Sequence, residues 1–288
     1  MRIVTLLQEG EELSAVRISR GFVPLRNIRE NGGGEWPNHL DALFAEGRYE
    51  EFKAWFEKGE GRSLAEGLEA IPEENVEYAP LLRRPGKIWG IGMNYGFGQP
   101  GSPIAGPDEE PVGFLKPATS LGGMRDSIVL PEGAGAITAE AELAIVIGRK
   151  CRNVGEEEAR SCVAGFAAVL DVTAADIHAR NPRFLTRAKS YDTFFGLGPE
   201  LVCPEEVPDL LELEVATALN GKTEHRNKVA NMRYRPWYAV AFHSSFMTLN
   251  PGDILMTGTP GAVALRSGDL AECRIEGFLP LVQKVIKR

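Results

Sequence analysis

The chain has 288 residues, 43% of them hydrophobic, and its 40 acidic side chains outnumber its 32 lysines and arginines to give a formal net charge of -8. This length and composition predict a soluble globular protein, built as one large domain or as a large and a small one. The negative charge and the lack of a basic stripe argue against a nucleic-acid partner.

No run of residues approaches the roughly eighteen consecutive apolar positions of a membrane span, so no membrane partner is expected. The apolar start over 2–7 is too short for a signal peptide, which predicts a cytoplasmic location. The four cysteines (Cys151, Cys162, Cys203 and Cys273) form no C-x-x-C pair. We therefore predict buried free thiols and no zinc site.

Residues 1–80 are predicted to form a small α+β N-terminal domain. Apolar and polar residues first alternate and then recur at helical intervals. The expected elements are strands over 2–7, 13–18 and 21–25 and helices over 38–57 and 64–70. The single histidine of this segment, His39, stands at a helix start, where a structural or solvated role is expected.

The rest of the chain, 85–288, is predicted to form a mainly β domain with some α. Its many short strands and turns favour a curved, barrel-like β structure. A Gly- and Pro-rich loop over 93–111 is long enough to act as a lid over a site. Asn153, with Glu156 three residues later, predicts the capped start of a helix over 156–163. The other expected elements are strands over 87–92, 112–117, 127–131, 139–148, 211–219 and 254–257, a tight turn at Asn220-Gly221, and a helix from Pro236 whose His243 is expected in the core or at the surface.

Two acids interrupt the apolar strand predicted over 139–148. Side chains alternate along a strand, so Glu140 and Glu142 share one face while Leu143 projects from the other. Asp171 ends a second apolar run, where an unpaired charge is expensive to bury. Two interpretations are open. The strand is either an edge strand with a solvated face, or one side of a site in which three carboxylates bind Mg2+ or Mn2+.

Taken together, these residues resemble the fumarylacetoacetate hydrolase superfamily. The matching stretches are 88–95, 111–117, 141–148, 171–176, 187–192 and 251–260. They follow the family's order from residue 85 to residue 288. The resemblance implies the family's mixed β-sandwich roll, a homodimer, and a small N-terminal domain like that of many members.

The resemblance also implies a site. Its metal, Mg2+ or Mn2+ and sometimes Ca2+, is expected on Glu140, Glu142 and Asp171, the same acids that the strand pattern selects. Lys189 matches the family's active-site lysine, whose ammonium pairs with a substrate carboxylate or a developing enolate. The positions implied for substrate binding are Asn94, Tyr95, Gly258 and Thr259.

The chain departs from the family at the pair that activates water. Members that cleave carbon–carbon bonds carry a His and a Glu shortly after Asn-Tyr, whereas here Gly98 and Gly101 stand near those positions. Ala175 and His178 replace an Arg and a Gln that follow the metal aspartate. A bound metal can itself lower the pKa of water. The remaining candidates for a general base are His178 and, on a closing lid, Asp108, Glu109 and Glu110.

The sequence thus predicts a metal-dependent enzyme whose partner is a small-molecule 2-oxo acid. The first expectation is a hydrolase that cleaves carbon–carbon bonds in acylpyruvates or related diketo acids through a metal-stabilised enolate. The alternative is an oxaloacetate-type decarboxylase or a 2-hydroxydienoate isomerase (tautomerase), since enolate stabilisation serves these reactions too. A catalytically decayed member that only binds a metal or ligand is a second alternative. The intact acids and Lys189 argue against it, because buried charges cost stability.

Overall fold

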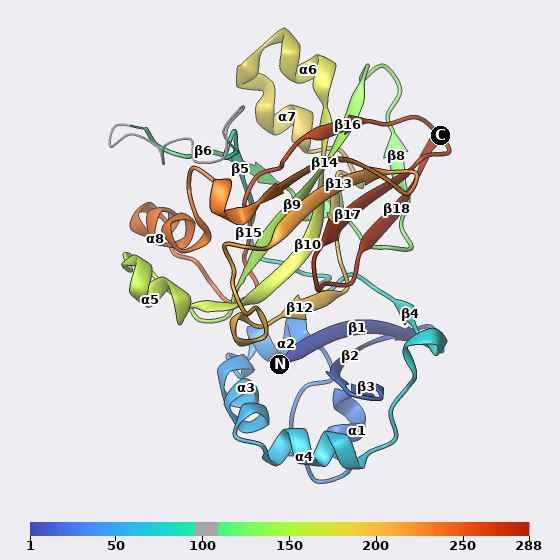
Figure 1. The fold of residues 1–288 in the computed structure, drawn as a ribbon, viewed down its shortest axis with the longest axis vertical. Coiled ribbons are helices and arrows are strands. Elements are labelled where there is room, and N and C mark those ends of the chain that lie inside the picture. Colours follow the sequence, from blue (N-terminus) through green and yellow to red (C-terminus); the bar gives the residue numbers. More distant parts are fainter. Residues whose placement is uncertain (96–108, 288) are drawn as a thin grey trace.

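The computed structural model describes residues 1–95 and 109–287 (Figure 1). Its strands are β1 (Arg2–Gln8), β2 (Glu11–Ile18), β3 (Gly21–Pro24), β4 (Glu77–Tyr78), β5 (Ile88–Gly92), β6 (Val112–Lys116), β7 (Leu121–Gly122), β8 (Ile128–Leu130), β9 (Ile137–Ile147), β10 (Val163–Ala174), β11 (Phe195–Leu197), β12 (Glu200–Val202), β13 (Glu214–Leu219), β14 (Lys222–Lys228), β15 (Ile254–Met256), β16 (Ala262–Ala264), β17 (Leu270–Ile275) and β18 (Leu281–Lys287). Its helices are α1 (Leu25–Glu30), α2 (Leu40–Ala45), α3 (Tyr49–Glu57), α4 (Glu60–Gly67), α5 (Glu156–Arg160), α6 (Ala175–Arg180), α7 (Leu185–Lys189) and α8 (Pro236–Phe246).

Among the described residues, the strands form two sheets. The main path of the 13-stranded sheet runs β3-β2-β1-β12-β10-β9-β15-β5-β6. The 5-stranded sheet has the order β14-β13-β17-β18-β8. Strands β13 and β17 of the smaller sheet pack on β9 and β10 of the larger one. The predicted mixed β-sandwich with some α is confirmed.

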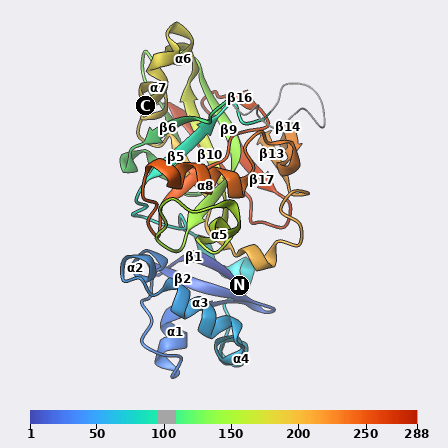
Figure 2. The same ribbon diagram turned by 90° about the vertical axis from the view of Figure 1, so that its left-hand side faces the viewer.

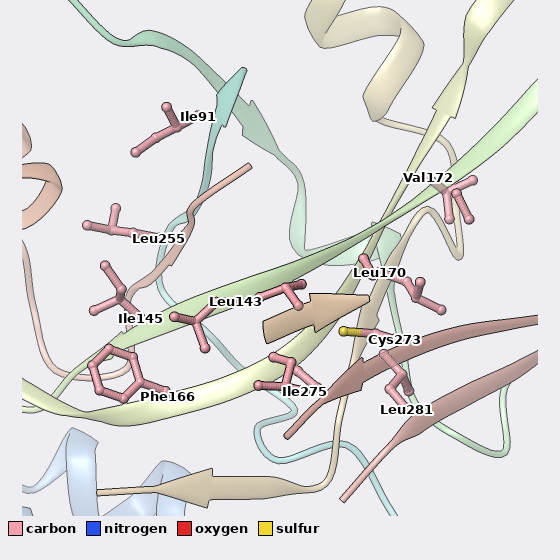
Figure 3. Close-up of a cluster of buried hydrophobic side chains, with 14 of the residues drawn as sticks. Ile91, Leu143, Ile145, Phe166, Leu170, Val172, Leu255, Cys273, Ile275 and Leu281 are labelled. Carbon is pink, nitrogen blue, oxygen red and sulfur yellow. The ribbon is translucent and has the colours of Figure 1, made fainter. Parts of the chain in front are cut away.

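Strands β9 and β10 lie at the centre of the molecule. They pair antiparallel over almost their full lengths, and every residue of β10 is buried. Leu143 and Ile145 point into the core beneath the smaller sheet, where Figure 3 shows them with Phe166 and Leu170. Alternate residues, such as Val146, belong to an apolar cluster on the opposite face. Because β9 has neighbours on both sides and is covered on both faces, the edge-strand interpretation is wrong.

The N-terminal elements join the rest of the molecule on this opposite face. β1 pairs with β12, so the large sheet continues from residues 1–80 into the later part of the chain. Tyr49 of α3 belongs to the same apolar cluster as Val146, and its hydroxyl donates to the Ala164 carbonyl at 2.9 Å. Figures 1 and 2 place β1–β3 and α1–α4 at one end of the molecule and α6 and α7 at the other. The division into domains over 1–80 and 85–288 stays a prediction.

Two predicted helices differ in the structure. The helix expected over 38–57 is two helices, α2 and α3, because Gly47 between them has a φ of 67°, a conformation that interrupts a right-handed helix. Asn153 does not cap α5. The N-cap is Gly155, which makes no side-chain cap bond, and Asn153 itself has a φ of 55°.

Other local predictions are confirmed. Asn220 and Gly221 both have positive φ between β13 and β14, as a tight hairpin turn requires. Helix α8 begins at Pro236, and His243 within it is buried. All four cysteines are free and buried. No helix within residues 1–95 or 109–287 is long and apolar enough to span a bilayer.

Candidate active site

Three carboxylates converge at one end of the β9–β10 pair. The register places Asp171 opposite Glu140, and Glu142 lies two residues further along the same face of β9. Figure 3 shows the two neighbours of Asp171, Leu170 and Val172, among the apolar side chains of the other face. Asp171 is 0% exposed and Glu142 is 2% exposed. One oxygen atom from each acid lies within 4.8 Å of the others, so the structure brings together the acids that the strand pattern selected.

Lys189, the last residue of α7, neutralises part of this charge. Its ammonium donates to Glu140 Oε2 at 2.7 Å and to Asp171 Oδ2, and it lies 4.7 Å from the centre of the Phe114 ring. Burial alone would lower the pKa of Lys189, but the charges of Asp171, Glu140 and Glu142 outweigh burial and raise that pKa above its usual value. Lys189 therefore stays protonated at neutral pH.

A second buried cation, Lys116 at the end of β6, lies on the other side of Asp171. Its Nζ is 2.8 Å from Asp171 Oδ1 and donates to the carbonyls of Val172, Lys189 and Phe194 at 3.0, 2.7 and 2.8 Å. Burial lowers the pKa of Lys116 to about 8, although the charge of Asp171 acts in the opposite direction. Sequence reasoning missed this residue. The signal available was a lysine at the end of an apolar strand, in a stretch that matches the family.

The charges and oxygen atoms of the cluster fit a divalent cation. When all three carboxylates are ionised, as metal ligands are, they and the two ammonium groups leave one net negative charge in a largely buried site. Burial, and then the charges of Asp171 and Glu140, raises the pKa of Glu142 well above its usual value. Asp171 Oδ1 is buried and accepts no hydrogen bond from the described residues, since Lys116 donates to three carbonyls. An all-oxygen donor set of this kind suits Mg2+, Mn2+ or Ca2+.

The acids and Lys189 open into a cavity of ≈ 310 Å³ whose wall includes Tyr95, Asn227 and the loop from Gly258 to Ala262. Within the described part of the chain, the buried hydroxyl of Tyr95 has no hydrogen-bond partner. Burial, and then the charge of Glu142, raises the pKa of Tyr95, so the hydroxyl keeps its proton. An unpaired donor at the wall of a cavity that suits a cation and its anionic ligand is a candidate contact for a substrate oxygen.

Asn94 also lines the cavity, but its amide is committed to the backbone. Nδ2 donates to the carbonyls of Tyr234 and Thr257 at 3.0 and 2.6 Å, and Oδ1 accepts from the Tyr234 N–H at 2.7 Å. Both N–H donors of Asn94 are thus used to hold the end of β5 against two loops. Of the neighbouring pair Asn94 and Tyr95, it is Tyr95 that has a donor to offer a ligand.

The loop after β15 orients one of the acids. Gly258 has a φ of +91°, and its N–H donates to Glu142 Oε2 at 2.5 Å. A Cβ atom on Gly258 would lie 2.8 Å from Asn94 Cβ, so both the conformation and the space require glycine. The Thr259 hydroxyl donates to the Gly261 carbonyl and accepts from the Gly261 N–H, each at 3.1 Å. The Gly258 amide therefore serves a protein carboxylate rather than an incoming anion.

Among the described residues, the predicted base candidates His178, Glu109 and Glu110 do not line the cavity. His178, on α6, is absent from its described lining, and Glu109 and Glu110 are exposed, with Glu109 paired to Arg233. The ionisable side chains among the described lining residues are the three acids, Lys189 and Tyr95. Gly98, Gly101, Asp108 and most of the loop over 93–111 that was predicted to act as a lid lie outside the described residues.

Fold and site together define a class of protein: a two-sheet β-rich fold that presents a buried acid cluster to a small cavity. The family model described as fumarylacetoacetate (FAA) hydrolase C-terminal matches residues 87–286. This range covers most of the chain and contains the three acids and Lys189. The chain belongs to the fumarylacetoacetate hydrolase family.

Relatives in this family include enzymes with different names. The mitochondrial oxaloacetate tautomerase of Rattus norvegicus is 34% identical over 233 residues, which are 78% of this chain and 74% of the relative. An uncharacterised protein of Archaeoglobus fulgidus is 38% identical over 209 residues, 72% of this chain and 80% of the relative. The homologues with named activities are enzymes, which supports an enzymatic function here.

Solved structures agree on the fold. A maleylpyruvate hydrolase from a Sphingobium species, in complex with manganese(II) and pyruvate, aligns with a TM-score of 0.80 and 26% identity over 100% of this chain and 99% of that one. A 5-carboxymethyl-2-hydroxymuconate delta-isomerase from Mycobacterium smegmatis aligns with a TM-score of 0.76 and 25% identity, again over 100% and 99% of the two chains. The family thus contains hydrolases, isomerases and tautomerases, and a manganese-bound member.

Proposed function

We propose that this protein is a divalent-metal-dependent enzyme that converts small 2-oxo acids through an enolate, and that its reaction is the keto–enol tautomerisation of an oxaloacetate-like acid. The observation that carries the proposal is the cluster of Glu140, Glu142 and Asp171. Lys189 and the Tyr95 hydroxyl, which has no hydrogen-bond partner in the described part of the chain, lie in the wall of the same cavity. The 34% identity to an oxaloacetate tautomerase supports this choice among the reactions of the family.

Glu140, Glu142 and Asp171 are the proposed ligands of Mg2+ or Mn2+. When bound, such a cation polarises the carbonyl oxygen of a 2-oxo acid and favours its enolate. Without a cation, the three ionised acids together with Lys116 and Lys189 carry one net negative charge. A divalent cation would reverse that charge to one net positive, which attracts an anionic substrate into the cavity.

The chain's own residues are assigned to binding and charge stabilisation. Lys189 stays protonated, so it stabilises negative charge on the substrate and does not act as a base. The Tyr95 hydroxyl also keeps its proton and donates to a substrate oxygen. Thr259 also lines the cavity, where its hydroxyl would donate to a substrate carboxylate in exchange for its bond to the Gly261 carbonyl. A volume of ≈ 310 Å³ lies at the small end of ligand pockets, which favours a short acid.

The choice of tautomerisation over hydrolysis rests on the general base. Tautomerisation moves a proton from carbon to oxygen by way of the enolate; solvent water can accept the carbon proton and return one to oxygen, and no water is consumed. Hydrolysis instead adds water to the substrate and gains about 100- to 10,000-fold from a base that activates it. The described lining of the cavity contains no imidazole. The sequence has Gly98 and Gly101 near the positions where the hydrolases carry their His and Glu. A reaction that needs no activated water therefore suits these residues better.

The test compares three reactions of one purified protein. Tautomerisation of oxaloacetate is followed by the ultraviolet absorbance of its enol, decarboxylation by pyruvate formation, and hydrolysis with a panel of acylpyruvates. Each assay is run with Mn2+, with Mg2+ and after exhaustive chelation. We expect metal-dependent tautomerisation as the fastest reaction. Metal-dependent hydrolysis of an acylpyruvate at a higher rate than tautomerisation would reverse the assignment.

Hydrolysis of an acylpyruvate-type substrate is the second candidate. It is favoured by the alignment, at a TM-score of 0.80, with the maleylpyruvate hydrolase that binds manganese(II) and pyruvate. For this reaction the base has to come from His178 or from Asp108, Glu109 and Glu110. With either reaction, we propose that the protein is a cytoplasmic homodimer. Its proposed partner is the small 2-oxo acid, with no nucleic acid or membrane.

A further inference from the structure

Lys116 has no role in the chemistry proposed above, yet it lies against the centre of the site. Its side chain is 0% exposed, and it is not among the residues that line the cavity. A lysine is almost never buried to this extent unless its charge has partners. The partners of this ammonium therefore indicate what the residue does.

The three N–H groups of Lys116 donate to three backbone carbonyls, which we call the carbonyl cage: Val172, Lys189 and Phe194. Val172 follows Asp171 in β10, Lys189 ends α7, and Phe194 precedes β11. One ammonium thus joins the backbone on both sides of the site. Its charge also lies 2.8 Å from Asp171 Oδ1, whereas the Lys189 ammonium contacts the other oxygen, Oδ2.

We propose that Lys116 is a positioning residue that fixes the Asp171 carboxylate where it binds the divalent cation, and holds the backbone of Lys189 beside it. This inference rests on the proposed metal site and deepens it. Lys116 acts through Asp171 and Lys189 and touches neither the cavity nor a substrate. Removing the ammonium leaves three carbonyls of the cage without their donor, so the segments that carry the two site residues lose a common anchor.

Charge alone makes a different prediction, which allows a decisive test. Lys116 is a cation beside the acids, so its removal by itself would increase the attraction of the cluster for Mn2+. Arginine keeps that charge, but its planar guanidinium cannot reproduce the compact, three-way donor geometry of an ammonium in the cage. If Lys116 acts only through its charge, Lys116→Arg keeps the Mn2+ affinity of the wild type. If Lys116 acts by positioning, both Lys116→Met and Lys116→Arg bind Mn2+ more weakly.

The experiment measures Mn2+ binding to the purified, metal-free protein by calorimetry, with no substrate present. The variants are Lys116→Met and Lys116→Arg. The matched control is Lys87→Met, which removes a lysine that pairs with buried Asp253 at 2.6 Å outside the acid cluster. We expect both Lys116 variants to bind Mn2+ about 10- to 100-fold more weakly, the usual effect of losing a group that orients a metal ligand. We expect Lys87→Met to bind it as the wild type does.

Each alternative result has one meaning. Normal affinity in Lys116→Arg, or normal or tighter affinity in Lys116→Met, overturns the positioning role. If the methionine and arginine variants do not fold, the conclusion rests on Lys116→Gln, whose amide still donates to part of the cage. Unchanged Mn2+ affinity in Lys116→Gln also overturns the proposal. Failure of the wild type to bind Mn2+ instead refutes the proposed metal site, which separates the two claims.

Discussion

The backbone N–H of Gly258 donates to the carboxylate of Glu142 at 2.5 Å, and this bond connects the loop after β15 to the acid cluster of β9. Glu142 is 2% exposed, and burial raises its pKa. A buried acid of this kind is stabilised by the Gly258 amide and, in our proposal, by the metal ion. The relationship yields separate expectations for the acid and for the glycine.

Replacing the acid removes a metal ligand and also a repulsive charge. We expect Glu142→Ala to lose Mn2+ binding and turnover, while the metal-free protein keeps its melting temperature within a few degrees. Relief of repulsion among the acids offsets the loss of the Gly258 hydrogen bond, which is worth about 1 kcal/mol. The measurement is thermal unfolding with and without Mn2+, because a bound ion raises the melting temperature of the wild type.

The control for this variant is Glu200→Ala. Glu200 is equally buried but interacts with Arg2 and the Leu279 amide. We expect this change to lower the melting temperature and to preserve the rise that Mn2+ produces. A Glu142→Ala protein that is still stabilised by Mn2+ would remove Glu142 from the ligand set.

Lys189 is assigned to the substrate rather than to the metal. Lys189→Met removes a positive charge that contacts Glu140 and Asp171, so Mn2+ should bind at least as tightly as before. Turnover should fall by about 100- to 1,000-fold, as when one preorganised donor to a developing anion is lost. Calorimetry with Mn2+ and steady-state kinetics check the two halves of this prediction. Loss of Mn2+ binding would show that Lys189 instead supports the acid cluster.

Much of the acid cluster could be predicted from the sequence because it depends on local periodicity. Alternation along β9 places Glu140 and Glu142 on one face, and the apolar run that ends in Asp171 predicts a neighbouring buried strand. Both inferences use residues within one strand. The resemblance to the family then added Lys189, which periodicity alone could not assign.

The contacts that sequence reasoning missed depend on distant segments. Lys116 becomes significant only when β10, the end of α7 and the residue before β11 converge on its ammonium. The amide of Asn94 is occupied by Tyr234, 140 positions away, so its structural use left no local signal. The pairing of β1 with β12 likewise joins residues about 200 positions apart, and no turn motif or hydrophobic periodicity predicts such a pairing.

The glycine that orients Glu142 should tolerate no side chain. Gly258→Ala places a methyl group at a φ of +91° and 2.8 Å from Asn94 Cβ. We expect a loss of stability above the roughly 1–2 kcal/mol of a left-handed alanine, and weaker Mn2+ binding because the loop that holds Glu142 must move. Gly268→Ala is the matched control. Its φ is +98°, and a Cβ atom there would have no described atom within 4 Å. Gly268→Ala should therefore lose only the stability that the backbone conformation costs and keep normal Mn2+ affinity. Equal effects of the two changes would remove the steric argument.

Stability should also fall in mild acid because of a histidine that is not part of the described cavity lining. His243 of α8 is 1% exposed and packs against Trp89, and burial lowers its pKa, although the bond to the Ala239 carbonyl acts in the opposite direction. In the unfolded chain, His243 has a pKa of about 6.5, whereas in the folded protein its pKa is lower. As the pH falls below about 6.5, the unfolded state therefore gains protons that the native state does not, and the free energy of unfolding decreases.

His243→Phe keeps an aromatic ring at this position and removes the titration. We expect the free energy of unfolding, measured with urea, to fall less in this variant than in the wild type between pH about 7.5 and pH about 5.5, where the other titrating groups contribute equally to both proteins. The direction of the difference is the test, because overpacking by phenylalanine shifts stability by the same amount at each pH and cannot change the slope. Parallel pH profiles for the two proteins would mean that His243 takes up its proton in the folded protein as readily as in the unfolded chain, and that its burial does not lower its pKa.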